Sequence, residues 1–137
     1  MVKICCENMK NKIPEISCSV FVTLNENLNV IEFLQKLKTI GYENCSVCKH
    51  KHDSNVSVKI IKTDYQQTWE IEDVIKNVFS LIEDSERMLT SIVEQFSGEM
   101  CVNIAVNQYG TNPEFSVSKE SLIKLCQLKA AFSIDIC

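Results

Sequence analysis

Glycine and proline are scarce in this chain, which has three glycines and two prolines in 137 residues. That scarcity excludes a collagen-like chain, a flexible linker and a low-complexity segment, all of which depend on these residues. Uninterrupted apolar runs are also short, and none approaches the roughly 18 residues that a membrane-spanning helix requires. The composition therefore predicts a water-soluble globular protein that does not associate with a membrane.

Positive charge is limited, and arginine is almost missing. The chain has 14 basic and 18 acidic residues, a net charge of −4, and Arg87 is its one arginine. Nucleic-acid-binding domains usually present a basic surface, and RNA-binding domains with a ferredoxin-like fold add aromatic residues on central strands. Residues 100–106, the comparable strand here, contain no aromatic residue. The sequence therefore predicts no nucleic-acid partner.

An export signal is also missing, although the chain has eight cysteines. Residues 1–7 are interrupted by charge too early for a signal peptide. Disulfide scaffolds are usually secreted and shorter than about 100 residues. Cys18 and Cys126 fall within apolar patterns, where a thiol behaves as a small hydrophobic group. We therefore expect free thiols and a cytoplasmic location.

Hydrophobic periodicity divides the chain into strands and helices. Alternation of apolar and polar residues predicts strands over 16–24, 56–60, 69–71, 100–106 and 132–136. Helical spacing predicts helices over 30–40, 72–96 and 119–128, with Asn29 and Ser118 as N-caps and Gly41 as a stop signal. The strands over 56–60 and 69–71 are expected to form a hairpin, and residues 42–55 an irregular polar loop.

This order of elements predicts one α+β domain over 1–137, with residues 1–15 as an N-terminal extension or an edge strand. The sheet is expected to be antiparallel, with a ferredoxin-like β-α-β-β-α-β core followed by a C-terminal helix and strand. The last strand should pack against Leu122, Leu125 and Leu128. Trp69 and Asp135 are interpreted as structural residues of the strands.

Four potential metal ligands lie close together in the predicted loop: Cys45, Cys48, His50 and His52. Two thiolates and two imidazoles can complete the tetrahedral shell of a zinc ion. Structural zinc sites usually separate their two ligand pairs by a longer stretch of chain. Four ligands within eight residues therefore reach a tetrahedral arrangement around one ion less easily. A zinc-binding protein or metalloenzyme and a solvated polar loop are therefore both open.

Motifs of nucleophilic or metal-dependent catalysis are missing: there is no Gly-x-Ser-x-Gly, no phosphate-binding glycine loop and no His-Glu-x-x-His. The sequence therefore favours a non-catalytic protein that requires no cofactor. Charge is distributed unevenly, because residues 70–99 contain eight acidic and two basic side chains. This stretch is either an ordinary solvated helix face or a surface that attracts a basic protein partner. The candidate contacts are Glu83, Asp84, Glu86 and Glu94.

Several short motifs resemble one bacterial family, DUF4279, a domain of unknown function. They are residues 19–23, the helix over 30–37 ending at Ile40 and Gly41, the pair Thr68 and Trp69, and the tails 113–122 and 132–137. The resemblance extends over residues 16–137, with two departures. Residues 42–55 lack the expected Gly- and Pro-containing loop, and Cys137 stands where a tyrosine is usual.

The resemblance implies a small cytosolic protein, and it implies a role like that of an immunity protein, which binds and neutralises a toxin. The expected function is therefore binding of a protein partner, such as a basic toxin, without catalysis. A zinc protein using Cys45, Cys48, His50 and His52 and an uncharacterised ligand-binding domain are the alternatives.

Overall fold

The structure is a computed structural model that describes residues 12–25, 29–108 and 112–136. Its strands are β1 (Glu15–Leu24), β2 (Ser46–Lys49), β3 (Val56–Lys62), β4 (Gln66–Gln67), β5 (Glu99–Asn107) and β6 (Ala131–Ile136). Its helices are α2 (Val30–Thr39), α3 (Ile71–Ile82), η2 (Glu83–Ser85), α4 (Glu86–Gln95) and α5 (Lys119–Gln127). None of these described helices is long and apolar enough to cross a membrane.

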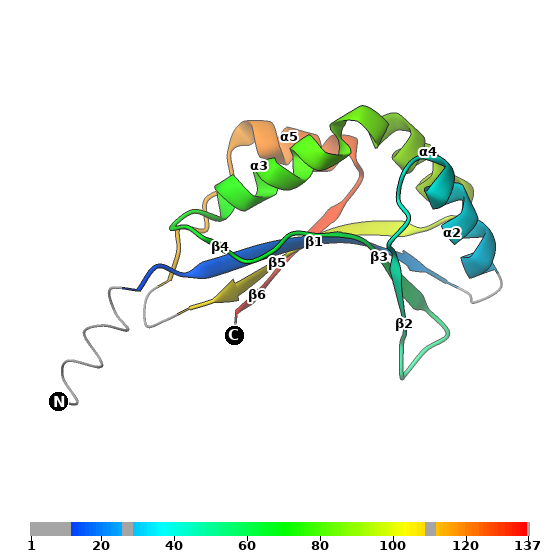
Figure 1. Cartoon of the computed structure of the whole chain (residues 1–137), viewed down its shortest axis with the longest axis horizontal. Helices are drawn as coiled ribbons and strands as arrows, with labels where there is room; N and C mark the ends of the chain where they lie inside the picture. The colour runs from blue at the N-terminus through cyan, green and yellow to red at the C-terminus, as the bar shows by residue number, and fades with distance from the viewer. Residues whose placement is uncertain (1–11, 26–28, 109–111, 137) are drawn as a thin grey trace.

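The strands form one six-stranded sheet in the order β2-β3-β1-β5-β6, with the short β4 also paired to β1. All pairs are antiparallel except β5 and β6, which run parallel. The helices lie together on one face of this sheet (Figure 1). The protein is therefore a two-layer α+β structure with a mostly antiparallel sheet, and no described element covers the opposite face.

The core lies between the helices and the sheet, because alternate strand residues are apolar on that side. The central strand β1 contributes a continuous buried row, namely Ile16, Cys18, Val20, Val22 and Leu24. From the helix layer, Phe33 of α2 packs edge-on against Phe96 at the end of α4, with ring centroids 5.3 Å apart. This packing confirms the strands predicted over 16–24 and 100–106 from their alternation.

The predicted hairpin of residues 56–60 with 69–71 is wrong. The partner of β3 in a hairpin is β2, which forms within the segment predicted to be an irregular loop. Trp69 lies outside the strands and is exposed, and Ile71 begins α3. β2 escaped prediction because all four of its residues are exposed, so it lacks the alternation of a half-buried strand.

The ferredoxin-like arrangement is not confirmed. β1 and β2, which flank α2 in the chain, are not neighbours in the sheet: β3 lies between them and is antiparallel to both. The expected strand over 132–136 is present as β6 and lies at the sheet edge beside β5. The expectation of an extension or edge strand over 1–15 falls largely on residues outside those described, since β1 begins at Glu15.

The single helix predicted over 72–96 is two helices joined by η2. The polar run Glu83, Asp84 and Ser85 tightens into a 3-10 turn there. The hydroxyl groups of Tyr42 and Ser85 are hydrogen-bonded at 2.6 Å, which ties this turn to the end of α2. The exposed turn η2, with its acidic residues Glu83 and Asp84, therefore separates α3 from α4.

Two predicted helix signals are confirmed and one is not. Gly41 has a φ of +100°, and Tyr42 N–H donates to the Leu37 carbonyl at 3.0 Å, so α2 ends as predicted. Ser118 caps α5 by accepting a hydrogen bond from Ser121 N–H at 3.1 Å. Asn29 precedes α2, but its side chain makes no capping hydrogen bond.

Candidate functional site

The hairpin of β2 and β3 carries the predicted metal ligands, but it does not bring them together. The Cys45 thiol donates to the Tyr42 carbonyl, Cys48 and His52 are exposed, and His50 has other partners. Among the described residues, no group of three or more His, Cys, Asp or Glu side chains is placed to hold a metal ion. Zinc binding stays a prediction, and it would require one ring nitrogen of His50 to leave its present partner.

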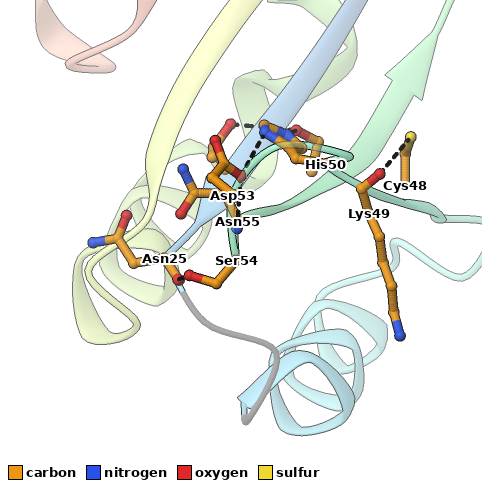
Figure 2. A network of polar contacts seen from close by, with 9 residues as sticks. Asn25, Cys48, Lys49, His50, Asp53, Ser54 and Asn55 are labelled. Atoms are coloured by element: carbon orange, nitrogen blue, oxygen red, sulfur yellow. Dashed lines mark hydrogen bonds and ion pairs between the residues drawn. The ribbon is translucent and has the colours of Figure 1, made fainter.

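His50 is the centre of a polar network at the turn of this hairpin (Figure 2). Its Nε2 lies 2.7 Å from the hydroxyl oxygen of Ser57, and its Nδ1 lies 3.3 Å from Oδ1 of Asp53. The Ser57 hydroxyl in turn lies 3.4 Å from that of Thr23 on β1. The network therefore connects the turn, β3 and the central strand across the uncovered face of the sheet.

The order of hydroxyl, imidazole and carboxylate in Ser57, His50 and Asp53 is that of a proton relay. The Asp53 side chain is 51% exposed, however, whereas the aspartate of serine hydrolases is buried. The same Oδ1 atom also accepts the Asn55 N–H at 2.9 Å, which is the hydrogen bond of an Asx turn. These contacts stabilise the turn, and the hydrogen bond between His50 and Ser57 holds the end of β2 against β3.

The predicted acidic contacts divide into two groups. Glu83 and Asp84 are exposed in η2, and neither carboxylate makes a hydrogen bond or ion pair with another described residue. Glu86 and Glu94 are already paired, with Lys124 Nζ 2.8 Å from Glu86 Oε1 and Lys129 Nζ 2.6 Å from Glu94 Oε1.

The expectation that Glu86 points freely into solvent is wrong, because its side chain is only 23% exposed. Its Oε1 atom is buried, and the Lys124 ammonium is its partner. Glu86 therefore joins α4 to α5, and of the four candidate contacts only Glu83 and Asp84 lack a partner among the described residues.

A further carboxylate, Glu72 of α3, was not singled out from the sequence. It accepts hydrogen bonds from Ser118 N–H at 2.6 Å, from the Ser118 hydroxyl at 2.7 Å and from the Ser121 hydroxyl. Burial opposes ionisation of this group, but the hydrogen bonds from Ser121 and Ser118 outweigh it and lower the pKa of Glu72. The charged carboxylate thus sits at the N-terminus of α5, where the helix dipole also favours it.

The same junction brings two of the resemblance motifs together. Glu114 N–H donates to the Trp69 carbonyl at 2.5 Å, and Ile71 N–H donates to the Glu114 carbonyl at 3.2 Å. Thr68 is buried just before this contact, and its hydroxyl donates to Asp73 at 2.8 Å. The motifs at 68–69 and 113–122 are therefore two sides of one structural joint before α3 and α5.

The described cysteines are free thiols, namely Cys18, Cys45, Cys48, Cys101 and Cys126. Burial raises the pKa of Cys18 to about 12 and also raises the pKa of Cys45, which favours the thiol over the metal-binding thiolate. The expected core position is confirmed for Cys18 and wrong for Cys126, which is exposed on α5. Asp135 is exposed on β6.

Comparison with known proteins identifies a family and no individual relative. The search of curated proteins and the search of solved structures each found no match to this chain. The sequence profile described as "Domain of unknown function (DUF4279)" matches residues 21–137, nearly the whole chain. That match includes the joint between residues 68–69 and 113–122 and all strands after the first half of β1. The chain therefore belongs to the DUF4279 family.

Proposed function

We propose that this protein binds a protein partner stoichiometrically and catalyses no reaction, in the manner of an immunity protein that masks a toxin. The observation that carries the proposal is an acidic corner formed by Glu83 and Asp84 with Leu81 and Met88 beside them. Leu81 is 61% exposed and Met88 is 51% exposed, although both belong to amphipathic helices that bury their other apolar residues.

This combination suits a protein interface. Exposed apolar side chains supply area that is removed from water on binding, and methionine is enriched at interfaces. Unpaired carboxylates at the rim attract a basic partner over distance and increase its association rate. The partner is therefore a protein with a basic surface, such as a toxin encoded by a neighbouring gene. A bacterial cytoplasm is the proposed location, and the free thiols of the described cysteines support it.

The test is the association rate of the purified protein with the product of a neighbouring toxin gene, measured at low and high salt. Changing Glu83→Lys and Asp84→Lys together should slow association at least tenfold at low salt and reduce its salt dependence. Neither side chain has a described partner to lose, so the melting temperature should be unchanged.

A matched variant, Glu120→Lys with Asp135→Lys, makes the same charge change at exposed positions away from the acidic corner. It should leave most of the association rate intact. Equal effects of the two variants would remove the acidic corner from the interface. Protection against many toxin molecules by one molecule of this protein would contradict stoichiometric binding itself.

A further inference from the structure

The outer edge of β2 presents backbone groups that no described strand pairs. β2 is the last strand in the sheet order, with β3 on its inner side. His50 N–H donates to the Asn55 carbonyl at 3.0 Å, and hydrogen-bonded pairs alternate along an antiparallel ladder. Cys48 and Ser46 therefore share the inward orientation of His50. The N–H and C=O groups of Val47 and Lys49 point outward.

A groove of about 340 Å³ lies beside the start of this strand. One wall is a stripe of α2 with helical spacing, namely Ile31, Leu34, Gln35 and Lys38. The other wall is the segment that leads into β2, with Tyr42, Glu43 and Cys45. Ile31 is 73% exposed in this groove, and Val47 is 43% exposed on the edge strand. A helix and the segment that leads into the edge strand thus flank one partly apolar groove, and the edge of β2 continues from it.

The same region is basic, although the chain as a whole is acidic. Residues 36–63 contain six lysines and two acidic residues, whereas the chain carries −4. Lys38 lines the groove, and Lys49 lies on the edge strand itself. Figure 2 shows the side chains of Cys48 and Lys49 leaving β2 on opposite sides, as the pleat of a strand requires.

We propose that this edge binds an extended, acidic segment of a protein partner, which adds a strand to the sheet beside β2. The segment exchanges backbone hydrogen bonds with Val47 and Lys49, and an apolar side chain enters the groove against Ile31 and Leu34. An acidic side chain two residues away pairs with Lys38 or Lys49. Strand addition between an edge strand and a helix is a common way to bind peptides, with affinity from the backbone and specificity from side-chain pockets.

Charge decides between a partner segment and a second copy of this chain. Pairing two β2 strands edge to edge would add the positive charge of Lys49 and the neighbouring Lys51 from each copy to one shared edge, and like charges close to each other across a strand pair are unfavourable. An acidic segment meets the same lysines with the opposite sign. The groove adjoins η2 through the hydrogen bond between Tyr42 and Ser85. The variants that test the groove change Val47 and Lys49 and leave Glu83 and Asp84 intact, so the two interfaces are tested separately.

The test selects peptides from a library of random octapeptides displayed on phage, in parallel on the unmodified protein and on Val47→Pro. Proline removes the outward N–H of Val47, and proline is tolerated on the outer side of an edge strand. Val47→Ala is the matched control because it keeps that N–H. Selection should enrich peptides with alternating apolar and acidic residues that bind Val47→Pro at least tenfold more weakly, with NMR shifts at residues 46–49.

Lys49→Glu tests the same edge without changing the backbone, and it should weaken the selected peptides at least tenfold. Enrichment of no such peptide, or equal binding to both the unmodified protein and the two edge variants, would overturn the proposal. Sedimentation of the protein alone identifies the competing occupant, since a dimer abolished by Val47→Pro would assign the edge to a second copy.

Discussion

Glu72 joins α3 to the start of α5 through hydrogen bonds from the backbone and side chain of Ser118, which lies 46 positions later in the chain. A carboxylate beside the first turn of another helix satisfies free N–H groups and interacts with the helix dipole. Hydrogen bonds to a charged group contribute more than those between neutral groups. Glu72 therefore contributes to holding the start of α5 against α3.

Replacing Glu72 by glutamine should lower the free energy of unfolding near pH 7 by about 1–2 kcal/mol, because charged hydrogen bonds become neutral ones. The lowered pKa of Glu72 also predicts a pH dependence. The folded state keeps this carboxylate ionised at a pH where the unfolded chain, with an ordinary value of 4.5, binds a proton. The contribution is complete above that value and is lost as pH falls through the lower folded pKa.

Urea unfolding of the unmodified protein and of Glu72→Gln, at pH 7 and pH 3, measures both effects. The difference between the two proteins should shrink at pH 3. Glu32→Gln is a matched control, since Glu32 is an exposed acidic residue in the first turn of α2. A loss of stability as large in Glu32→Gln would assign the effect to helix charge in general.

The roles of His50 and Glu72 in the fold could not be predicted from the sequence alone. The position of His50 two residues after Cys48 suggested a metal ligand, but its partners Asp53 and Ser57 come together only when the turn forms. Ser118 was recognised as a cap, because that signal is local. Its acceptor Glu72 could not be recognised, because the contact depends on how two distant helices pack.

At the scale of elements, α5 has two faces of different importance. Leu125 and Leu128 are buried in the core, and Phe132 and Ile134 of β6 pack against the same cluster. Leu122 was expected to join them, but it is 51% exposed. The leucines share helical spacing in the sequence, and only the packing distinguishes the inner face from the outer one.

Leu125→Ala should therefore lower the free energy of unfolding by about 2–5 kcal/mol, the range for removing a buried leucine side chain. Leu122→Ala removes the same atoms from an exposed position of the same helix and should change it by less than about 0.5 kcal/mol. Chemical denaturation of both variants gives the comparison. A similar loss in the two would mean that the outer face of α5 is covered in solution.

Elements with a buried face were predictable, and those without one were not. The alternation from Ile16 to Leu24 reports one buried row of β1. The exposed β2 has no such row. Buried apolar residues continue at helical spacing from Ile82 to Leu89, so the sequence does not show that η2 divides the helix between them. The hairpin partner of β3 was predicted wrongly, since apolar alternation indicates that a strand has a core face and not which strand lies beside it.

At the scale of the whole molecule, the central strand β1 of the sheet is buried, and the edge strand β2 is exposed to solvent. β1 is paired on both sides and covered by the helices, while β2 has one partner and four exposed residues. Local opening requires less free energy where few apolar contacts are lost. Stability is therefore expected to fall from β1 toward β2.

Amide hydrogen exchange followed by NMR should show this gradient. Amides of β1 and β5 should exchange most slowly, near the rate set by global unfolding, and inward amides of β2 should exchange at least a hundredfold faster. Uniform protection across the sheet would contradict the gradient and would indicate that the β2 edge is covered in solution.

The central place of β1 also has a consequence for synthesis on the ribosome. Ser19 pairs with Asn103, so the strand made early waits for a neighbour made 84 positions later. Until then, the nascent chain carries an apolar strand with one flank open, a condition that invites pairing with other chains. Closing so long a loop also slows folding, because its entropy must be lost before the contact forms. Codon changes that slow translation between β3 and β5 should therefore increase aggregation of this protein.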